Sequence, residues 1–122
     1  MIRLPYPPTV NTYWRSTCRG KYLTVYTTAK GKQYRKGTMG VILVASERVT
    51  TGHKDSLAVT IDVTFPDRRK RDLDNILKAL LDALQHAGVY EDDSQIKDLR
   101  IRAVGVEKPG WVEVEWKPIE EG

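Results

Sequence analysis

The clearest pattern along the chain is a strict alternation of apolar and polar positions between residues 57 and 65. The apolar positions are Leu57, Val59, Ile61, Val63 and Phe65. Successive side chains of a strand point to opposite faces, so this segment is typical of a half-buried β-strand. The intervening residues are small or polar, which predicts a sheet with one face left open.

Four further segments are expected to be strands. They are 2–6, 21–27, 99–103 and 112–116. The first ends at a run of prolines, which cannot donate to a sheet ladder, and a polar loop is expected from Asn11 to Gly20. The turn Lys108-Pro109-Gly110 is expected to join the last two strands into an antiparallel hairpin.

Two segments have the spacing of helices. In 28–45 one face holds Tyr34, Thr38, Val41, Ile42 and Ala45, although three glycines each cost about 1 kcal/mol relative to alanine. The second helix follows a loop at 66–71, with Asp72 as its N-cap and Gly88 at its end. Its apolar stripe consists of Leu73, Ile76, Leu77, Leu80, Leu84 and Ala87.

This order of elements predicts one α+β domain over residues 1–122. The strand–helix–strand unit at 57–103 should bring two parallel strands together. Because the strands have a polar face, they are not buried on both sides. We therefore expect two layers, with a mixed β-sheet and its helices packed on one face.

Charge is divided unevenly along the chain. Residues 1–54 carry ten Lys and Arg and the single acid Glu47, whereas residues 55–122 carry ten against fifteen acids. A basic half suits a polyanion, and an acidic half suits cations or a catalytic metal. Cys18 is the only cysteine, which excludes an intrachain disulfide and a cysteine-based zinc site. With no apolar run of about 20 residues, we expect a cytoplasmic protein and no membrane partner.

Acidic residues gather where the second helix begins. Asp72 and Asp74 flank Leu73, a spacing that lets both carboxylates approach one cation. Two such anions about 4 Å apart repel by roughly 4 kcal/mol at an effective dielectric of 20, and a divalent cation relieves that repulsion. Oxygen ligands favour Mg²⁺ or Mn²⁺ over zinc. Lys78 lies one turn after Asp74, so its ammonium is expected beside the acids.

A third acid is expected from the turn after the helix, which contains Glu91, Asp92 and Asp93. In a strand–helix–strand unit this turn lies at the opposite end of the sheet from the helix start, unless the chain bends. Each feature also has a structural interpretation: a helix cap, an i,i+4 ion pair and a solvated turn. The metal-site hypothesis depends on acids, lysine and a basic run meeting at one junction.

The basic run precedes the acids directly. It consists of Arg68, Arg69, Lys70 and Arg71. Each side chain that neutralises a DNA phosphate adds about 0.9 to the salt slope of binding, whereas a solvated loop is the alternative. Arg15 lies near Tyr13, Trp14, Tyr22 and Tyr26, which can stack on splayed bases or pack in a core.

These segments resemble the RusA family of Holliday junction resolvases, which are small bacterial and phage-derived endonucleases. The segment PYPPTVNTYWR is similar to the family's Pro-Pro-x-x-Asn opening, and DRRKRDLDNILKALLDAL and GVYEDDSQI match at corresponding distances. The metal-binding acids that the resemblance implies are Asp72, Asp74 and Asp93. Asp92 is the weaker choice for the third acid. The resemblance also implies that Lys78 is essential, that Arg71 contacts DNA and that the protein is a homodimer.

Together, the residues and the resemblance predict a Mg²⁺-dependent endodeoxyribonuclease, with Mn²⁺ as a second candidate metal. Its expected partner is a four-way junction or other branched DNA, which it would resolve by paired nicks during recombination and repair. A bound metal would lower the pKa of a water and polarise the phosphate. The alternatives are a non-catalytic module that binds branched DNA and a metal nuclease for flaps and forks.

Overall fold

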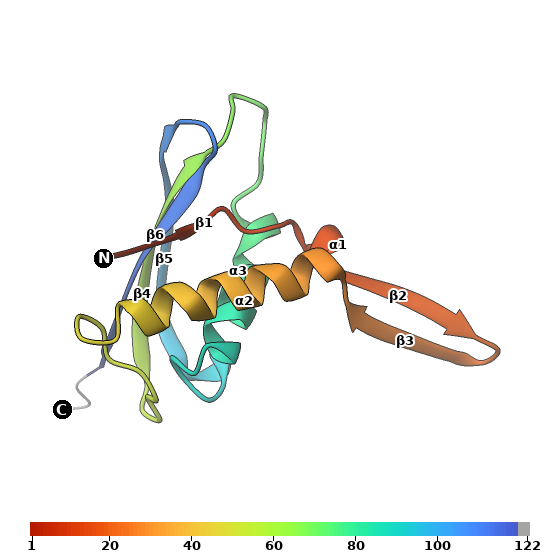
Figure 1. Cartoon of the computed structure of the whole chain (residues 1–122), viewed down its shortest axis with the longest axis horizontal. Helices are drawn as coiled ribbons and strands as arrows, with labels where there is room; N and C mark the ends of the chain where they lie inside the picture. Colours follow the sequence, from red (N-terminus) through yellow and green to blue (C-terminus); the bar gives the residue numbers. More distant parts are fainter. Residues whose placement is uncertain (120–122) are drawn as a thin grey trace.

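The main sheet of the molecule has four strands in the order β1-β6-β4-β5 (Figure 1). The structure, a computed structural model, describes residues 1–119, without the side chain of Arg19. The strands of this sheet are β1 (Ile2–Pro5), β4 (Leu57–Phe65), β5 (Ile96–Val106) and β6 (Trp111–Pro118). β4 runs parallel to β5 and antiparallel to β6, so the sheet is mixed, as predicted.

The last two strands do not form the predicted hairpin, because β4 lies between them. β6 carries the buried Val112, Val114 and Trp116, and its interior position gives it hydrogen-bonded neighbours on both sides. β5 exposes most of its residues and takes the edge of the sheet. Charged residues on that edge, such as Arg100 and Arg102, disfavour pairing with another chain.

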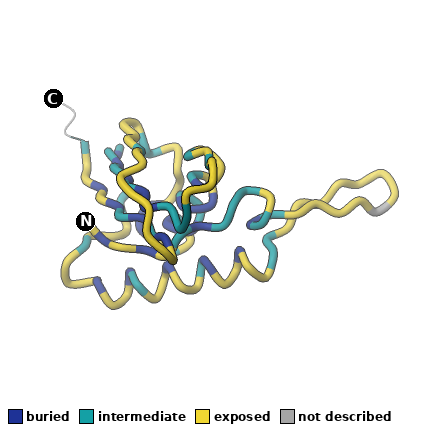
Figure 2. The backbone as a smooth tube through the Cα atoms, turned by 90° about the horizontal axis from the view of Figure 1, so that it is seen from above, coloured by how far each residue is buried: buried dark blue, intermediate teal, exposed yellow. Residues whose placement is uncertain are grey.

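Two helices cover one face of the sheet (Figures 1 and 2). They are α2 (Ala29–Val44) and α3 (Asp74–His86). From α3, Ile76, Leu80 and Leu84 are buried in one core with the inward-facing residues of β4. Burying each of these side chains contributes about 1.5–3 kcal/mol. The other face of β4 stays half-buried, so the two-layer α+β prediction is confirmed.

Helix α2 forms over 16 residues despite its glycines. The face predicted for it is the buried one: Tyr34, Thr38 and Ile42 are buried, and Ala45 follows as the C-cap. Tertiary packing of that face outweighs the low helix propensity of glycine. No helix within residues 1–119 is long and apolar enough to cross a membrane.

The segment predicted as a polar loop is ordered instead. It forms the short helix α1 (Val10–Tyr13) and then β2 (Trp14–Arg19), which pairs with β3 (Tyr22–Thr27). β2 escaped prediction because its residues show no apolar alternation. The pair is a separate two-stranded sheet that projects from the body, with nearly every residue exposed (Figures 1 and 2). We call residues 14–27 the hairpin arm.

Candidate active site

Helix α3 begins at Asp74, so its N-cap position lies at Leu73, one residue after the predicted cap Asp72. Leu73 has helical backbone angles and packs its half-buried side chain against the core, so the N-cap position carries no polar side chain. Asp72 only accepts a bond from the Asn75 N–H through its backbone carbonyl, at 3.3 Å. The N-cap residue makes no side-chain capping bond. Asp72 and Asp74 are therefore both exposed at the start of the helix.

Lys78 lies one turn further along α3 and is also exposed. Its Nζ is 5.4 Å from the centroid of the Trp14 ring, a cation–π contact worth about 0.5–1 kcal/mol at an exposed site. The Trp14 ring in turn lies against Tyr13, with 4.1 Å between centroids. This stack gives the ammonium a defined neighbour and still leaves it accessible to a substrate.

The acidic turn after α3 assigns different tasks to its two aspartates. Asp92 caps the short 3₁₀ helix η1 (Asp93–Gln95): its Oδ1 accepts from the Ser94 N–H at 2.9 Å, and Gln95 Oε1 accepts from the Asp92 N–H. The Ser94 N–H lowers the pKa of Asp92. Burial, followed by the neighbouring Asp92, raises the pKa of Asp93, and the Lys78 ammonium opposes that rise. Asp92 therefore serves as the cap of this turn.

The structure does not gather the three predicted metal ligands into one cluster. Within residues 1–119, no group of three or more His, Cys, Asp or Glu stands close enough to hold a metal ion. The charged groups of α3 that act on Asp93 are Lys78 and Asp82, from its second and third turns. Asp72 precedes the helix and Asp74 is its first residue, and neither is among the groups that shift the pKa of Asp93. The roles of all three acids stay predictions.

The two acids at the helix start nevertheless suit a magnesium ion. Mg²⁺ is usually held by one or two carboxylates, and waters and substrate phosphate oxygens complete its octahedron. Asp72 and Asp74 offer oxygen ligands and are open to solvent, so a phosphate can approach them.

The loop before α3 presents its positive charge in two ways. Three of its basic residues extend into solvent: Arg68, Arg69 and Lys70. Arg71 is half-buried, with its Nη2 2.8 Å from Asp67 Oδ2 and its guanidinium 5.9 Å from the Tyr6 ring centroid. The Arg71 guanidinium lowers the pKa of Asp67. Arg71 is thus held in place, whereas Arg69 pairs more loosely with the same Asp67, at 3.8 Å, and stays exposed like Arg68 and Lys70.

Arg71, which precedes Asp72 in the chain, also lines a shallow groove of about 670 Å³. The groove lies between the N-terminal proline segment and α2, which contributes Lys30 and Tyr34. None of its lining residues is acidic. Its two cations and open shape suit a DNA strand that continues from the acids.

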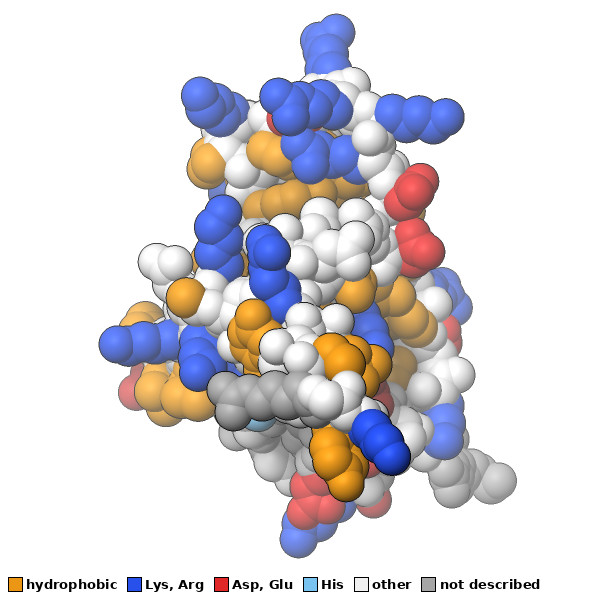
Figure 3. Space-filling model, turned by 90° about the vertical axis from the view of Figure 1, so that its right-hand side faces the viewer, with side chains coloured by type: hydrophobic (Ala, Val, Ile, Leu, Met, Phe, Trp, Pro, Cys, Tyr) orange, Lys and Arg blue, Asp and Glu red, His pale blue; other side chains and the backbone are white. Residues whose placement is uncertain are grey.

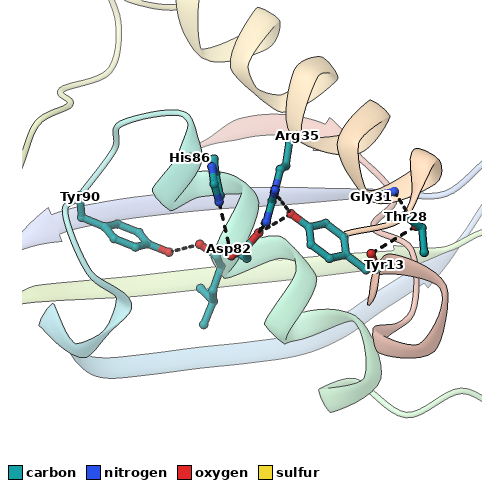
Figure 4. Close-up of polar contacts among 8 residues, drawn as sticks. Tyr13, Thr28, Gly31, Arg35, Asp82, His86 and Tyr90 are labelled. Atoms are coloured by element: carbon teal, nitrogen blue, oxygen red, sulfur yellow. Dashed lines mark hydrogen bonds and ion pairs between the residues drawn. The ribbon is translucent and has the colours of Figure 1, made fainter. Parts of the chain in front are cut away.

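Sequence reasoning missed a polar network that joins three helices (Figure 4). Asp82 of α3 accepts from Arg35 Nη2 of α2 at 2.8 Å and from the Tyr13 hydroxyl of α1. Arg35 Nε also donates to the Tyr13 hydroxyl at 2.7 Å. Burial raises the pKa of Tyr13, which keeps it a donor. His86 stands at i,i+4 from Asp82, the one local signal in the sequence.

The network fixes the surroundings of Lys78. Asp82 lies one turn after Lys78, and Tyr13 immediately precedes the Trp14 ring that faces the ammonium. The contacts of Asp82 therefore hold α1 against α3 next to Lys78.

The chain matches the family model described as endodeoxyribonuclease RusA over residues 5–116. It is 48% identical to the crossover junction endodeoxyribonuclease rusA of Enterobacteria phage HK97 over 107 residues, which are 88% of this chain and 83% of that protein. It is 38% identical to the crossover junction endodeoxyribonuclease RusA of Escherichia coli strain K12 over 113 residues, 93% of this chain and 89% of that protein. The chain therefore belongs to the RusA family.

Proposed function

We propose that the protein is a Mg²⁺-dependent crossover junction endodeoxyribonuclease. It binds a four-way DNA junction and makes paired nicks in its phosphodiester backbone. Family membership over residues 5–116 supports the activity. The observation that carries the site is an exposed carboxylate pair, Asp72 and Asp74, directly after an exposed basic loop. Action on DNA would place the protein in the cytoplasm of a bacterial or phage-infected host.

In this proposal each part of the junction at α3 has a separate task. Asp72 and Asp74 hold the ion, which when bound lowers the pKa of a water and polarises the phosphate. Lys78 stabilises the negative charge that develops on the phosphate during cleavage. Arg68, Arg69 and Lys70 bind flanking phosphates, and the groove at Arg71 receives the continuing strand.

Symmetric cuts also lead us to propose a homodimer, because a two-fold axis gives two equivalent sites. Because Asp93, Asp72 and Asp74 do not form one cluster within a chain, dimerisation bears on which chain's site Asp93 completes. Asp93 either acts within its own chain after DNA binds or completes the site of the other chain. The two arrangements make different predictions for mixed dimers.

The test of the activity is cleavage of a labelled mobile four-way junction with Mg²⁺, with Mn²⁺ and with EDTA, beside the Asp72→Asn variant. We expect paired nicks that need both the metal and Asp72. Junction binding without cutting under any metal would contradict the proposal and favour a non-catalytic binding module. Faster cutting of flaps or forks at the same salt concentration would favour a nuclease for those substrates.

Mixed dimers test how Asp93 is used. Asp74→Asn and Asp93→Asn chains are mixed and allowed to exchange. If Asp93 serves the other chain, each mixed dimer keeps one intact site and nicks the junction once. If Asp93 serves its own chain, both sites of the mixed dimer are defective and no nick appears.

A further inference from the structure

The hairpin arm is the most exposed part of the described chain and carries charge of one sign. Its sequence includes Arg15, Arg19 and Lys21 and no acid, and the first acid of the whole chain is Glu47. Figure 3 faces the end from which the arm projects: Lys and Arg side chains are spread across it, and acids lie mainly toward its margins. Such a surface favours a polyanionic partner.

Large apolar side chains lie uncovered on the same arm. Tyr22 is 78% exposed, Leu23 70%, Val25 62% and Tyr26 46%. The register pairs Arg15 with Tyr26 on one face, whereas Val25 lies on the other. A lone two-stranded hairpin is marginally stable in water, so leaving these groups exposed is costly unless a partner covers them.

The root of the arm, unlike its tip, is firmly held. The Thr28 N–H donates to the Tyr13 carbonyl at 2.9 Å, and Thr28 Oγ1 donates to the Thr12 carbonyl at 2.5 Å, which joins the two ends of the arm. A Cβ on Gly31 would lie 2.6 Å from the Tyr13 carbonyl, so α2 approaches this root as closely as only glycine allows. The arm therefore extends in a fixed direction.

The root also adjoins the candidate catalytic lysine. Trp14, the first residue of β2, is the aromatic ring that lies under the Lys78 ammonium. A ligand held by the arm is thereby positioned relative to Lys78. Strands of six residues reach roughly 20 Å, enough to extend well into a branched nucleic acid.

We propose that the hairpin arm enters the open centre of a four-way junction, where Tyr22 and Leu23 at its tip cover exposed base faces. Arg15 and Lys21 contact the phosphates that border the opening. Aromatic stacking needs bases that are splayed apart, which a branch point offers and a continuous duplex does not. The basic charge of the arm matches a phosphate backbone, and its exposed aromatic side chains match base faces, so the partner that we propose is a nucleic acid. This inference rests on the proposed function.

The test measures binding without cleavage, in EDTA, to a four-way junction and to a duplex of the same sequence. One 2-aminopurine probe is placed at the branch point of the DNA, and another is placed within one duplex branch of the junction. The variant is Tyr22→Ala with Leu23→Ala. The matched control is Leu43→Ala with Val44→Ala, which removes two exposed apolar side chains at the far end of α2.

We expect wild type and control to change the fluorescence of the branch-point probe. The fluorescence of the probe in the duplex branch of the junction should stay unchanged. The tip variant should lose this change and bind the junction at least about fivefold more weakly, the lower range for one lost stacking contact. Its duplex affinity should change little. The proposal would be overturned if the tip variant bound the junction as tightly as wild type and changed the fluorescence of the branch-point probe as wild type does. A tip variant that alters only the oligomeric state in sedimentation would also overturn it, because a second copy would then cover the arm.

Failure of the proposed function is visible separately. At saturating protein and Mg²⁺, the tip variant should still nick the junction, because its substitutions lie outside the acids and Lys78. Wild-type protein that binds and opens the branch point but never cuts would contradict the nuclease and leave the arm's role supported. Wild-type protein that cuts without affecting the branch-point probe would support the nuclease and contradict the role of the hairpin arm.

Discussion

At its C-terminal end α3 is closed by backbone hydrogen bonds, whereas at its N-terminal end the same helix begins without a side-chain cap. Gly88 takes a φ of 82°, its N–H bonds to the Gln85 carbonyl, and the Val89 N–H bonds to the Leu84 carbonyl. This pattern satisfies the last carbonyls of the helix. One turn earlier, Asp82 holds Arg35 and Tyr13.

The N-terminal end shows none of this closure. Asp72 and Asp74 are exposed, and Leu73 in the cap position cannot accept a hydrogen bond through its side chain. Groups that stabilise the fold are thus concentrated at one end of α3, and groups suited to chemistry at the other. Substitutions at the two ends should affect different quantities, stability at one and turnover at the other.

The largest effect is expected at the N-terminal end, from Asp74→Asn. Losing a metal-binding carboxylate should lower the rate of junction cleavage by about 1000-fold or more, since metal stabilisation of the transition state is worth several kcal/mol. Junction affinity and the free energy of unfolding should be nearly unchanged. Single-turnover cleavage measures the loss, with the exposed Glu47→Gln as the control. A rate within about tenfold of wild type would remove Asp74 from the mechanism.

Asp82→Ala should have its effect on stability instead. It leaves Arg35 and the Tyr13 hydroxyl without their acceptor in a partly buried site, which should lower the free energy of unfolding by about 1–3 kcal/mol. Urea unfolding measures the change. Asp98→Ala, in an exposed ion pair with Arg100, should cost less than about 0.5 kcal/mol. An equal loss of unfolding free energy in the two variants would show that the network stabilises the fold no more than an exposed ion pair does.

A pair of glycine substitutions should give opposite signs. Gly88→Ala forces alanine into a left-handed conformation in otherwise open space, at a cost of about 1 kcal/mol. Gly40→Ala lies on the exposed face of α2, also in open space, and should increase stability by up to about 1 kcal/mol. Both values come from the same urea titrations. Stabilisation by Gly88→Ala would contradict the helix closure described above.

The smallest effect concerns pH. The pKa of Asp93 is raised, so its ionised form costs stability at pH values above that pKa. Asp93→Asn should therefore be slightly more stable than wild type at pH 7, and the gain should vanish as the pH falls below the ordinary carboxyl value of about 4. Asp92→Ala should instead lose stability at pH 7, because Asp92 caps η1 and its pKa is lowered. Unfolding curves at several pH values separate the two.

Local periodicity was enough to predict much of the fold. The alternation in β4 and the stripe of α3 are each determined by neighbours a few residues away, and both elements formed where the pattern placed them. The choice of strand partners is not local. β6 pairs with β1 and β4, and not with β5, because its buried side chains require an interior position in the sheet. The sequence of the turn between β5 and β6 does not reveal this choice of partners.

The candidate site was predictable only in part. The exposure of Asp72, Asp74 and Lys78 at one helix end follows from their spacing and from the position of the apolar stripe. The network at Asp82 joins residues as distant as 13 and 82, and the cation–π contact joins Trp14 to Lys78. Such pairs come together only through the packing of α1 and α2 on α3, which sequence spacing does not contain.

The separateness of the hairpin arm has an evolutionary consequence. Because β2 and β3 add no strand to the main sheet, the folded body owes none of its sheet hydrogen bonds to them. Changes between residues 15 and 26 can therefore accumulate with little penalty to folding, as long as the root at Thr28 and Gly31 is kept. In the function that we propose, substitutions in the arm would change how the protein binds branched DNA and would leave the acids and Lys78 unchanged.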